Sequence, residues 1–413
     1  MYALKLELKL NNKERYALKG CAGFRRFVYN FGLALVKDSW NLGIKGSDSK
    51  KIDSAKKILT NDLMKQEQYK WMKLYPSTIY QSAFQDLKDA FSRWRKGQNK
   101  LPVFKAKKDK QSFTVYKSSG TYLEKGKPAL PFTNRQVLVL GKRITIPSLG
   151  KFRLKEQIPF ICSAQTFHIS READKWYVSF VVDAEKLPPL LHEVVEPTGI
   201  DLGVKTFATL SDGQTYDAPK PMKRAKTKLA KIQWRNRRKQ LGDRKQGIKA
   251  SKNAHKYYRK LAAHHARIAS QRCDFLQKTT TEISQKYAHI RIEDLNVQSM
   301  IANHKLSAAI SDLGFYEFRR QLEYKAPMFG TRVELVDRWY PSSKKCNKCH
   351  HIQPMPLVER VFVCGKCGYT ISRDLGAAIN LKHAPVEVVR SARPWILNVC
   401  GLARADSPGW SRK

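Results

Sequence analysis

Four of the eight cysteines form two pairs whose spacing suits a metal site. Two residues separate the members of each pair, and fourteen residues separate the pairs. Two thiolates on a tight turn can reach one tetrahedral Zn2+, and two such turns complete a closed site of four sulfur ligands. A redox dithiol needs only one pair, and iron–sulfur clusters usually have other cysteine spacings. We therefore predict one structural zinc ion in a zinc ribbon, with the ligands Cys346, Cys349, Cys364 and Cys367.

The other cysteines, and two histidines beside the first pair, are not expected to bind zinc. These cysteines stand singly along the chain, so the pattern favours metal ligation in a reducing compartment over a disulfide framework. His350 and His351 could replace a cysteine, but we expect them at the surface or against nucleic acid.

Three carboxylates form the second set of residues that could do chemistry. Asp201 lies in a short apolar strand, Glu293 ends another, and Asp374 precedes a predicted helix. A lone carboxylate in such a place is usually a turn residue or a helix cap, and Asp374 by itself fits a cap. Three that converge would repel one another and bind divalent cations, for which Mg2+ is the default. Two such ions about 4 Å apart can activate water and stabilise the leaving oxygen of a phosphodiester.

The 413-residue chain is strongly basic, with 78 Lys and Arg against 35 Asp and Glu and a formal net charge of +43. Such a chain repels itself unless a polyanion neutralises it, which indicates a nucleic-acid partner. A ribosomal-type or merely solubilising charge fits less well, because the excess runs through long foldable segments. Residues 220–278 hold 20 Lys or Arg against two acids, which favours a groove for a phosphate backbone over a solvated helical face.

A membrane or secreted location is not expected. No run of residues reaches the ~18 consecutive apolar positions needed to span a bilayer. At the N-terminus apolar and charged residues alternate, which predicts a half-buried strand and not the apolar core of a signal peptide. The fold is therefore expected to start at residue 1, and the protein to stay inside the cell.

The N-terminal half is expected to combine strands with a helical insertion. A strand over residues 2–10 precedes mainly helical residues 14–96, which include a helix for which Ser77 is the predicted cap. Further strands lie between residues 112 and 183. This order predicts a small β-barrel interrupted by a helical lobe, with a linker marked by residues 187–189 and by Pro197.

A second unit is expected to begin at residue 198 and to carry all three carboxylates. Its predicted elements are strands around Asp201 and over 207–210, long helices within 220–278, a strand at 289–294, a helix at 313–324, a strand at 332–336, the cysteine module, and a helix at 375–382. Residues from 384 onward contain prolines and are expected to be weakly ordered.

These motifs occur together in a known protein family. The stretches that carry the resemblance are Gly-Ile-Asp-Leu-Gly-Val-Lys-Thr-Phe-Ala-Thr (199–209), Ile-Glu-Asp-Leu (292–295), the two cysteine pairs, Ser-Arg-Asp-Leu-Gly-Ala-Ala-Ile-Asn (372–380), and residues 26–30, 101–107 and 319–326. In this order they resemble the TnpB (OrfB) proteins, which are transposon-encoded, RNA-guided endonucleases related to the type V CRISPR effectors. The resemblance runs from about residue 1 to residue 382.

The resemblance implies an α+β multidomain fold, in which a β-barrel with a helical insertion precedes an RNase H-like (RuvC) α/β domain that carries an inserted zinc ribbon. The implied boundaries are 1–13 and 111–195 for the wedge-like barrel, 14–110 for the helical recognition lobe, 196–345 and 368–383 for the nuclease domain, 346–367 for the ribbon, and 384–413 for the tail. Asp201, Glu293 and Asp374 become the catalytic triad that binds two Mg2+, and the paired cysteines become the zinc ligands.

The resemblance also implies an RNA-guided DNA endonuclease whose partners are a guide RNA and target double-stranded DNA. Base pairing would then read the target sequence. We expect a monomer in the cytoplasm of a prokaryotic cell, associated with the nucleoid. One alternative, a nuclease-inactive repressor, predicts loss of one of the acids. Another, a strand-transfer transposase, typically orders its acids Asp, Asp, Glu, whereas the order here is Asp, Glu, Asp.

One residue departs from the pattern. The family commonly has Asn two residues after the third Asp, where this chain has Gly376. The change is expected to loosen the start of the last helix or to alter a hydrogen bond near the site.

Overall fold

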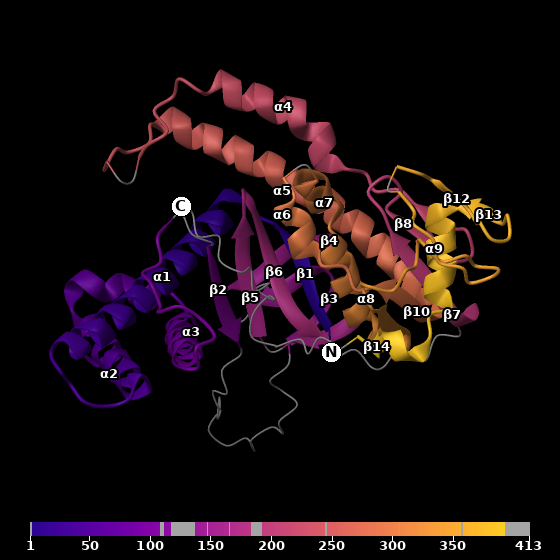
Figure 1. The fold of residues 1–413 in the computed structure, drawn as a ribbon. Coiled ribbons are helices and arrows are strands. Elements are labelled where there is room, and N and C mark those ends of the chain that lie inside the picture. Colours follow the sequence, from indigo (N-terminus) through magenta and orange to yellow (C-terminus); the bar gives the residue numbers. More distant parts are fainter. Residues whose placement is uncertain are drawn as a thin grey trace, which may run out of the picture. The chain divides into compact units, whose positions relative to one another are not determined.

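The computed structural model describes residues 2–107, 111–116, 137–146, 148–164, 166–182, 192–243, 246–304, 306–356 and 358–392. The chain divides into two compact units, Met1–Glu185 and Lys186–Lys413 (Figure 1). The predicted linker residues 187–189 and the end of the predicted tail, from residue 393, lie outside the described residues. The prediction that Pro197 belongs to the linker is wrong, because Pro197 lies inside the strand β7 (Val194–Leu202), opposite His289. No helix in the described ranges is both long enough and apolar enough to cross a membrane.

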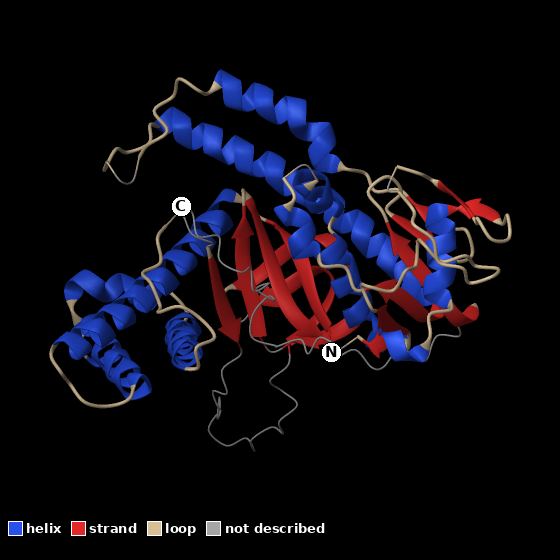
Figure 2. Cartoon of the chain, viewed as in Figure 1, coloured by secondary structure: helices blue, strands red, loops and turns tan. Residues whose placement is uncertain are grey.

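The first unit contains a six-stranded antiparallel sheet in the order β2-β5-β6-β1-β4-β3 (Figure 2). The strands are β1 (Tyr2–Lys9), β2 (Ser112–Tyr116), β3 (Val137–Ile146), β4 (Gly150–Ala164), β5 (Thr166–Glu172) and β6 (Lys175–Val182). The N-terminal strand lies in the middle, between β4 and β6. Among the described residues β2 and β3 do not pair with each other, so the predicted β-barrel is seen there as a half-barrel.

The predicted helical insertion follows β1. It contains α1 (Asn12–Asn41), α2 (Asp48–Asn61) and α3 (Ser77–Arg95), with the short 3-10 segments Leu63–Lys65 and Glu67–Leu74 between α2 and α3. Asn11 and Glu14 form a capping box at the start of α1, which satisfies backbone donors that the helix itself cannot pair. The prediction that Ser77 caps α3 is wrong, because Pro76 holds the cap position and Ser77 lies inside the helix.

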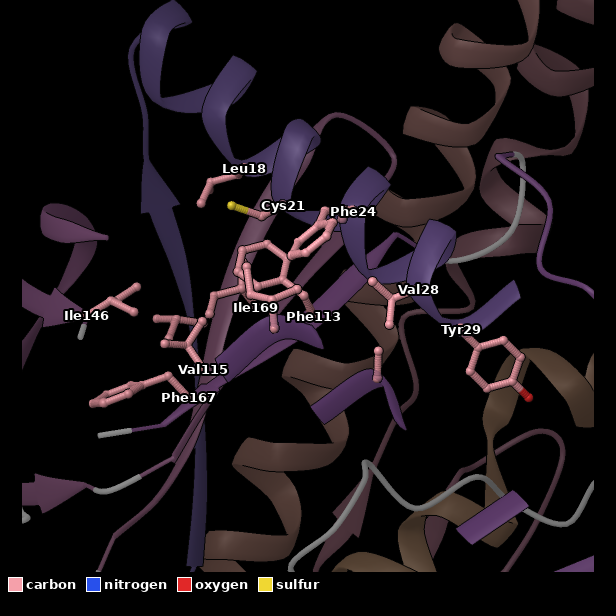
Figure 3. Packing of buried hydrophobic residues seen from close by; sticks show 14 of the residues in the cluster. Leu18, Cys21, Phe24, Val28, Tyr29, Phe113, Val115, Ile146, Phe167 and Ile169 are labelled. Atoms are coloured by element: carbon pink, nitrogen blue, oxygen red, sulfur yellow. The ribbon is translucent and has the colours of Figure 1, made fainter. Parts of the chain in front are cut away.

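The insertion and the sheet share one hydrophobic core (Figure 3). Leu18 and Phe24 of α1 lie in the same cluster of fully buried side chains as Phe113 of β2 and Ile169 of β5. Close packing of this kind supplies most of the free energy that holds helices on a sheet. The helical lobe is therefore part of the same folding unit as the strands that flank it in the sequence.

The second unit is built on a mixed sheet in the order β14-β11-β10-β7-β8-β9. Its strands are β7 (Val194–Leu202), β8 (Ala208–Leu210), β9 (Thr215–Tyr216), β10 (Tyr287–Glu293), β11 (Arg332–Val336) and β14 (Val389–Ser391). Strands β7, β10 and β11 run parallel, whereas β8, β9 and β14 run antiparallel to their neighbours. The carboxyl ends of the three parallel strands therefore meet at one edge of the sheet.

Six helices and a small hairpin complete the described part of this unit. The helices are α4 (Pro221–Arg235), α5 (Lys252–Lys286), α6 (Val297–Ala302), α7 (Ser307–Leu313), α8 (Phe315–Phe329) and α9 (Arg373–Lys382), and the hairpin is β12 (Val361–Val363) with β13 (Thr370–Ser372). Helix α4 lies alongside the N-terminal part of α5 (Figure 1). These are the long basic helices that the charge pattern predicts.

The prediction that the chain is weakly ordered from residue 384 onward is wrong for residues 386–391. Val386–Val388 form a 3-10 turn, and β14 pairs with β11 through Val336 and Val389. The side chain of Arg390 on β14 also forms an ion pair with the carboxylate of the buried Asp294. Such a three-residue edge strand has too little sequence pattern to be recognised, because its stability comes from its neighbour.

Candidate active site

The first predicted acid, Asp201, lies near the carboxyl end of β7. Strand β7 forms here because Ile200 is fully buried and pairs with two neighbouring strands, opposite Leu210 of β8 and Ile292 of β10. Successive side chains of a strand point to opposite faces. Asp201 therefore projects to the face opposite Ile200 and is half-buried.

The second acid, Glu293, is the last residue of β10. Because Ile292 pairs with Ile200 in parallel register, Glu293 and Asp201 each stand one residue beyond the same pair. Adjacent strands lie about 4.8 Å apart, and equivalent positions share a face. The sheet therefore brings residues that are 92 positions apart in the sequence to neighbouring places on one face at its carboxyl edge.

The third acid, Asp374, lies in the first turn of α9. This helix packs directly on β7 at Gly199, where an added Cβ would lie 1.9 Å from the carbonyl oxygen of Ala378. Gly199 and Asp201 are two residues apart and so share a face of the strand. Asp374 lies one turn before Ala378 on α9, so the close approach at Gly199 brings the first turn of the helix to the carboxylate of β7.

The electrostatics agree with this arrangement. Burial, together with the charges of Asp374 and then Glu293, raises the pKa of Asp201 to about 7, against an opposing effect of Arg373. Burial likewise raises the pKa of Glu293 to about 7, with a contribution from the neighbouring Asp294. Charges that perturb one another's ionisation lie close together, and burial of like charges is costly unless a cation offsets it.

Two contacts hold α9 at its far end. The guanidinium of Arg291 donates to the carbonyl oxygens of Lys382 and Ala384, at 2.8 and 3.0 Å. The same side chain is held by the buried Glu334 on β11, with 3.0 Å between Nε and Oε2. A cation at a helix C-terminus satisfies the last carbonyls and stabilises the helix. Arg291 therefore anchors the helix that carries Asp374 to the strand that carries Glu293.

The paired cysteines lie together as the spacing predicts. Their four sulfur atoms all lie within 4.8 Å of one another, with 3.7 Å between Cys346 and Cys367 and 3.5 Å between Cys349 and Cys364. These separations are far longer than a disulfide bond. Within the described ranges these four cysteines are the only group of His, Cys, Asp or Glu side chains whose ligand atoms gather in this way, and Asp201, Glu293 and Asp374 form no such group. His350 and His351 are exposed and belong to no such set.

The cysteine module is joined to α9 by two asparagines. The side-chain amide of Asn347, between the first two cysteines, donates to the carbonyl oxygen of Gly376 at 2.9 Å and to Oδ1 of Asn380 at 3.0 Å. The buried amide of Asn380 donates in turn to the carbonyl oxygens of Ser342 and Lys345, both at 2.7 Å. Although Asn380 lies within the last motif, the sequence carries no signal for these links, because they join residues far apart in the chain.

The structure shows how Gly376 affects the start of α9. Helix α9 runs without interruption through this residue, so its start is not broken. An added Cβ would lie 3.1 Å from Oδ1 of Asn347 and 3.2 Å from a methyl carbon of Ile371. Oδ1 of Asn347 is buried and accepts no hydrogen bond from the part of the chain that the structure describes. The glycine therefore leaves room for the close contact between α9 and the cysteine module.

Comparison with known proteins agrees with the motifs. Residues 179–304 match the family described as "Probable transposase" (OrfB_IS605), and residues 315–381 match the one described as "Cas12f1-like, TNB domain". Residues 1–45, which here form β1, α1 and the turn after it, match a "Helix-turn-helix domain" of the OrfB_IS605 type.

Full-length relatives are found in bacteria. The chain is 30% identical over 384 residues to a protein of Streptomyces pristinaespiralis, covering 92% of this chain and 89% of the relative. It is also 30% identical over 416 residues to InsQ of Escherichia coli K12, covering 95% and 96%. Both carry the provisional name RNA-guided DNA endonuclease. The chain therefore belongs to the TnpB (OrfB) family of transposon-associated RNA-guided DNA endonucleases.

A solved structure shows the same fold. The chain matches a Cas12f1 protein, determined with its guide RNA and target DNA, with a TM-score of 0.50 and 15% identity. The match covers 90% of this chain and 83% of the other.

Proposed function

We propose that this protein cleaves DNA at sites selected by a bound guide RNA, and that Asp201, Glu293 and Asp374 form the hydrolytic centre with two divalent cations. The observation that carries the proposal is the geometry that brings the acids to one edge of the sheet, namely the register of Ile200 with Ile292 and the close packing of α9 on Gly199. The raised pKa of Asp201, caused by burial and then by the charges of Asp374 and Glu293, agrees with it. Three acids from β7, β10 and α9 thus share one electrostatic environment, in a chain whose net charge is +43.

The strand order supports an RNase H-like (RuvC) assignment for the second unit. Strands β9, β8 and β7 form an antiparallel run, which continues into the parallel strands β10 and β11. The acids stand at the carboxyl ends of β7 and β10 and in the first turn of α9, which packs on β7. Ligands of open α/β sheets bind at this edge.

The residues present fit divalent cations bound by oxygen. Carboxylate oxygen is the ligand that Mg2+ prefers, and the mutual repulsion of the three acids is what such ions would relieve. When bound, two such ions activate a water molecule and stabilise the leaving oxygen of a phosphodiester. Arg360, whose Nη1 lies 3.9 Å from Oδ1 of Asp374, would help to hold that carboxylate.

Binding of guide RNA and target DNA would rest on the basic surface. Helices α4 and α5 contribute most of the 20 Lys and Arg within residues 220–278, and few of their side chains are buried. Phosphate contacts of this kind give affinity without reading sequence, which agrees with a division of labour in which a guide RNA selects the target. The relatives come from bacteria, and association with the nucleoid is a consequence of the same charge.

The decisive experiment is a cleavage assay on the purified complex. The chain is purified with its co-expressed RNA and is given DNA that carries a matching target within a randomised flank. We expect cuts that require both the RNA and Mg2+ and that stop when the metal is chelated. Binding without cuts would instead indicate an RNA-guided repressor, and joining of DNA ends would indicate strand transfer.

Zinc at the cysteine cluster makes a separate prediction. Four thiolates at tetrahedral distances suit Zn2+ and leave no open position, so the metal would be structural. We expect about one zinc ion per chain, and Cys364→Ser should abolish it and should release the amide hydrogens of β12 and β13 to fast exchange. Cys273→Ser, at an exposed cysteine of α5, is the matched control. Full zinc content in the Cys364 variant would contradict the site.

Metal binding by the acids should depend on pH. Because the pKa values of Asp201 and Glu293 are both about 7, each is largely protonated at pH 6, and a cation must displace those protons. We expect the affinity for Mn2+ or Mg2+, measured by calorimetry, to fall by roughly 10- to 100-fold from pH 8 to pH 6.

The same raised pKa values predict how the free energy of unfolding of the metal-free protein changes with pH. The folded protein holds more protons than the unfolded chain between the ordinary carboxyl range and pH 7. The free energy of unfolding should therefore fall as the pH rises through that window, and added divalent cation should remove the trend. A metal affinity that does not change with pH would contradict the arrangement of the acids.

A further inference from the structure

One large aromatic side chain at the edge of the sheet has no packing role. Trp339 is 85% exposed, whereas most other tryptophans of the described chain are buried or half-buried. No ring contact of Trp339 with another aromatic side chain is found in the described residues. A single exposed apolar side chain is common on protein surfaces, so exposure alone does not indicate a binding role for Trp339. Its position near the acids and the rigid loop that holds it do indicate one.

Trp339 follows β11 at the edge where the acids lie. Strand β11 runs parallel to β10, and its last residue, Val336, pairs with Glu293. Trp339 stands three residues beyond that pair. The loop that bears the tryptophan therefore leaves the sheet beside the carboxyl end of β10, which carries one of the three acids.

The loop is held rigidly around this side chain. The backbone amide of Asp337 donates to Val388 at 2.8 Å, and the amide of Trp339 donates to the carboxylate of Asp337 at 2.8 Å. On one side, Arg338 pairs with the buried Asp294 at 2.9 Å. On the other, the hydroxyl of Tyr340 donates to the carbonyl oxygen of Asn380 at 3.3 Å. The side chains on either side of Trp339 in the sequence are therefore held against the protein, whereas the indole ring itself is exposed to solvent.

We propose that Trp339 stacks on an unpaired nucleobase of the DNA strand that enters the carboxylate site. This inference rests on the proposed function and names one contact of that site. An aromatic ring presented on a rigid support loses little entropy on stacking, and every base offers a face. In a duplex the neighbouring bases cover those faces, so the contact selects single-stranded DNA. The basic side chains nearby in the sequence, Lys344 and Lys345, suit the adjoining phosphates.

The test compares three variants in the full chain with its co-purified RNA, all carrying Asp201→Asn so that DNA is bound but not cut. Trp339→Ala should weaken binding of a single-stranded oligonucleotide by about 5- to 150-fold, the range of one lost base stack. Trp339→Phe should retain most of the affinity. Val386→Ala, at an aliphatic side chain that is 77% exposed in the same unit, should change it little.

An oligonucleotide with an abasic site distinguishes base stacking by Trp339 from a structural role of this residue. A set of oligonucleotides is made in which one nucleotide, at a different position in each, lacks its base. At one of these positions the indole should have no base to stack on, so the parent chain and the Trp339→Ala variant should bind that oligonucleotide equally. Double-stranded DNA should show no dependence on Trp339. The melting temperature of the Trp339→Ala chain should be unchanged, because so little of the side chain is packed.

The proposal is overturned if Trp339→Ala binds single strands as tightly as the parent, if Trp339→Phe is as weak as Trp339→Ala, or if no abasic position removes the difference. The proposed function fails by another result, which is the absence of RNA- and metal-dependent cuts in the chain with Asp201 intact. If the affinity depends on Trp339 but no such cuts occur, the stacking contact is supported and the proposed nuclease activity is rejected.

Discussion

Replacing Asp201 with asparagine should abolish DNA cleavage while leaving the binding of RNA and DNA nearly unchanged. Asparagine keeps the shape of the side chain but cannot supply the anionic oxygen that a divalent cation needs. Loss of a central metal ligand should lower the cleavage rate by roughly 10³-fold or more. The measurement is single-turnover cleavage of a matched target, with binding measured in parallel by filter retention.

The same substitution should stabilise the metal-free protein. Asp201 is held among like charges in a partly buried place, which is why its pKa lies near 7. Removing one charge relieves that repulsion, so the thermal midpoint at pH 8 without divalent cation should rise. Asp217→Asn, at an exposed aspartate of the same unit, is the matched control and should change neither rate nor midpoint. If the Asp201→Asn variant cleaves DNA at the normal rate, Asp201 is not required for catalysis.

Replacing Gly199 with alanine should displace α9 and disable the site from a distance. The added Cβ would lie 1.9 Å from the carbonyl oxygen of Ala378 and 2.6 Å from the backbone nitrogen of Lys382. Both are backbone atoms, so the helix itself must move, and Asp374 moves with it. A misplacement of about 1 Å at a catalytic group can cost about 10²-fold in rate. Overpacking should also lower the free energy of unfolding by about 1–3 kcal/mol.

The measurements for Gly199→Ala are the cleavage rate and chemical denaturation. Gly23→Ala is the control for the change of residue type, because Gly23 lies inside α1 and an added Cβ there meets only the flexible end of Arg26, at 3.9 Å. That variant should cut normally and gain up to about 1 kcal/mol of stability. If Gly199→Ala kept both rate and stability, the close packing of α9 on β7 would be contradicted.

The features that follow from local pattern could be read without a structure. Two CxxC pairs predict a four-sulfur cluster, and the structure confirms that the four sulfur atoms lie together. The alternation of residues 2–10 predicts β1, and the apolar runs predict β6 and β11. Each of these signals depends on neighbouring residues alone, because side-chain periodicity and ligand spacing are set by backbone geometry over a few positions.

Two predictions that the structure contradicts concern the bounds of elements. Ser77 looks like a cap in sequence, but the helix begins one residue after Pro76, and no side-chain cap is used. Strand β14 is stabilised by pairing with β11, more than fifty residues earlier. The predicted barrel is seen in part, because the described strands form a half-barrel in which β2 and β3 do not pair. Pairing of distant strands has no local signal in the sequence.

By itself, the sequence determined which residues of this protein can do chemistry: four thiols at metal spacing, three acids at the ends of predicted elements, and a basic excess suited to a polyanion. Only the tertiary structure decided where the acids stand, through the parallel register of Ile200 with Ile292 and the contact of α9 at Gly199. It also decided that Asn347 and Asn380 join the cysteine module to that helix. The reason is physical: residue type and spacing act within a few positions, whereas strand register and close backbone packing are settled by burial of the whole unit.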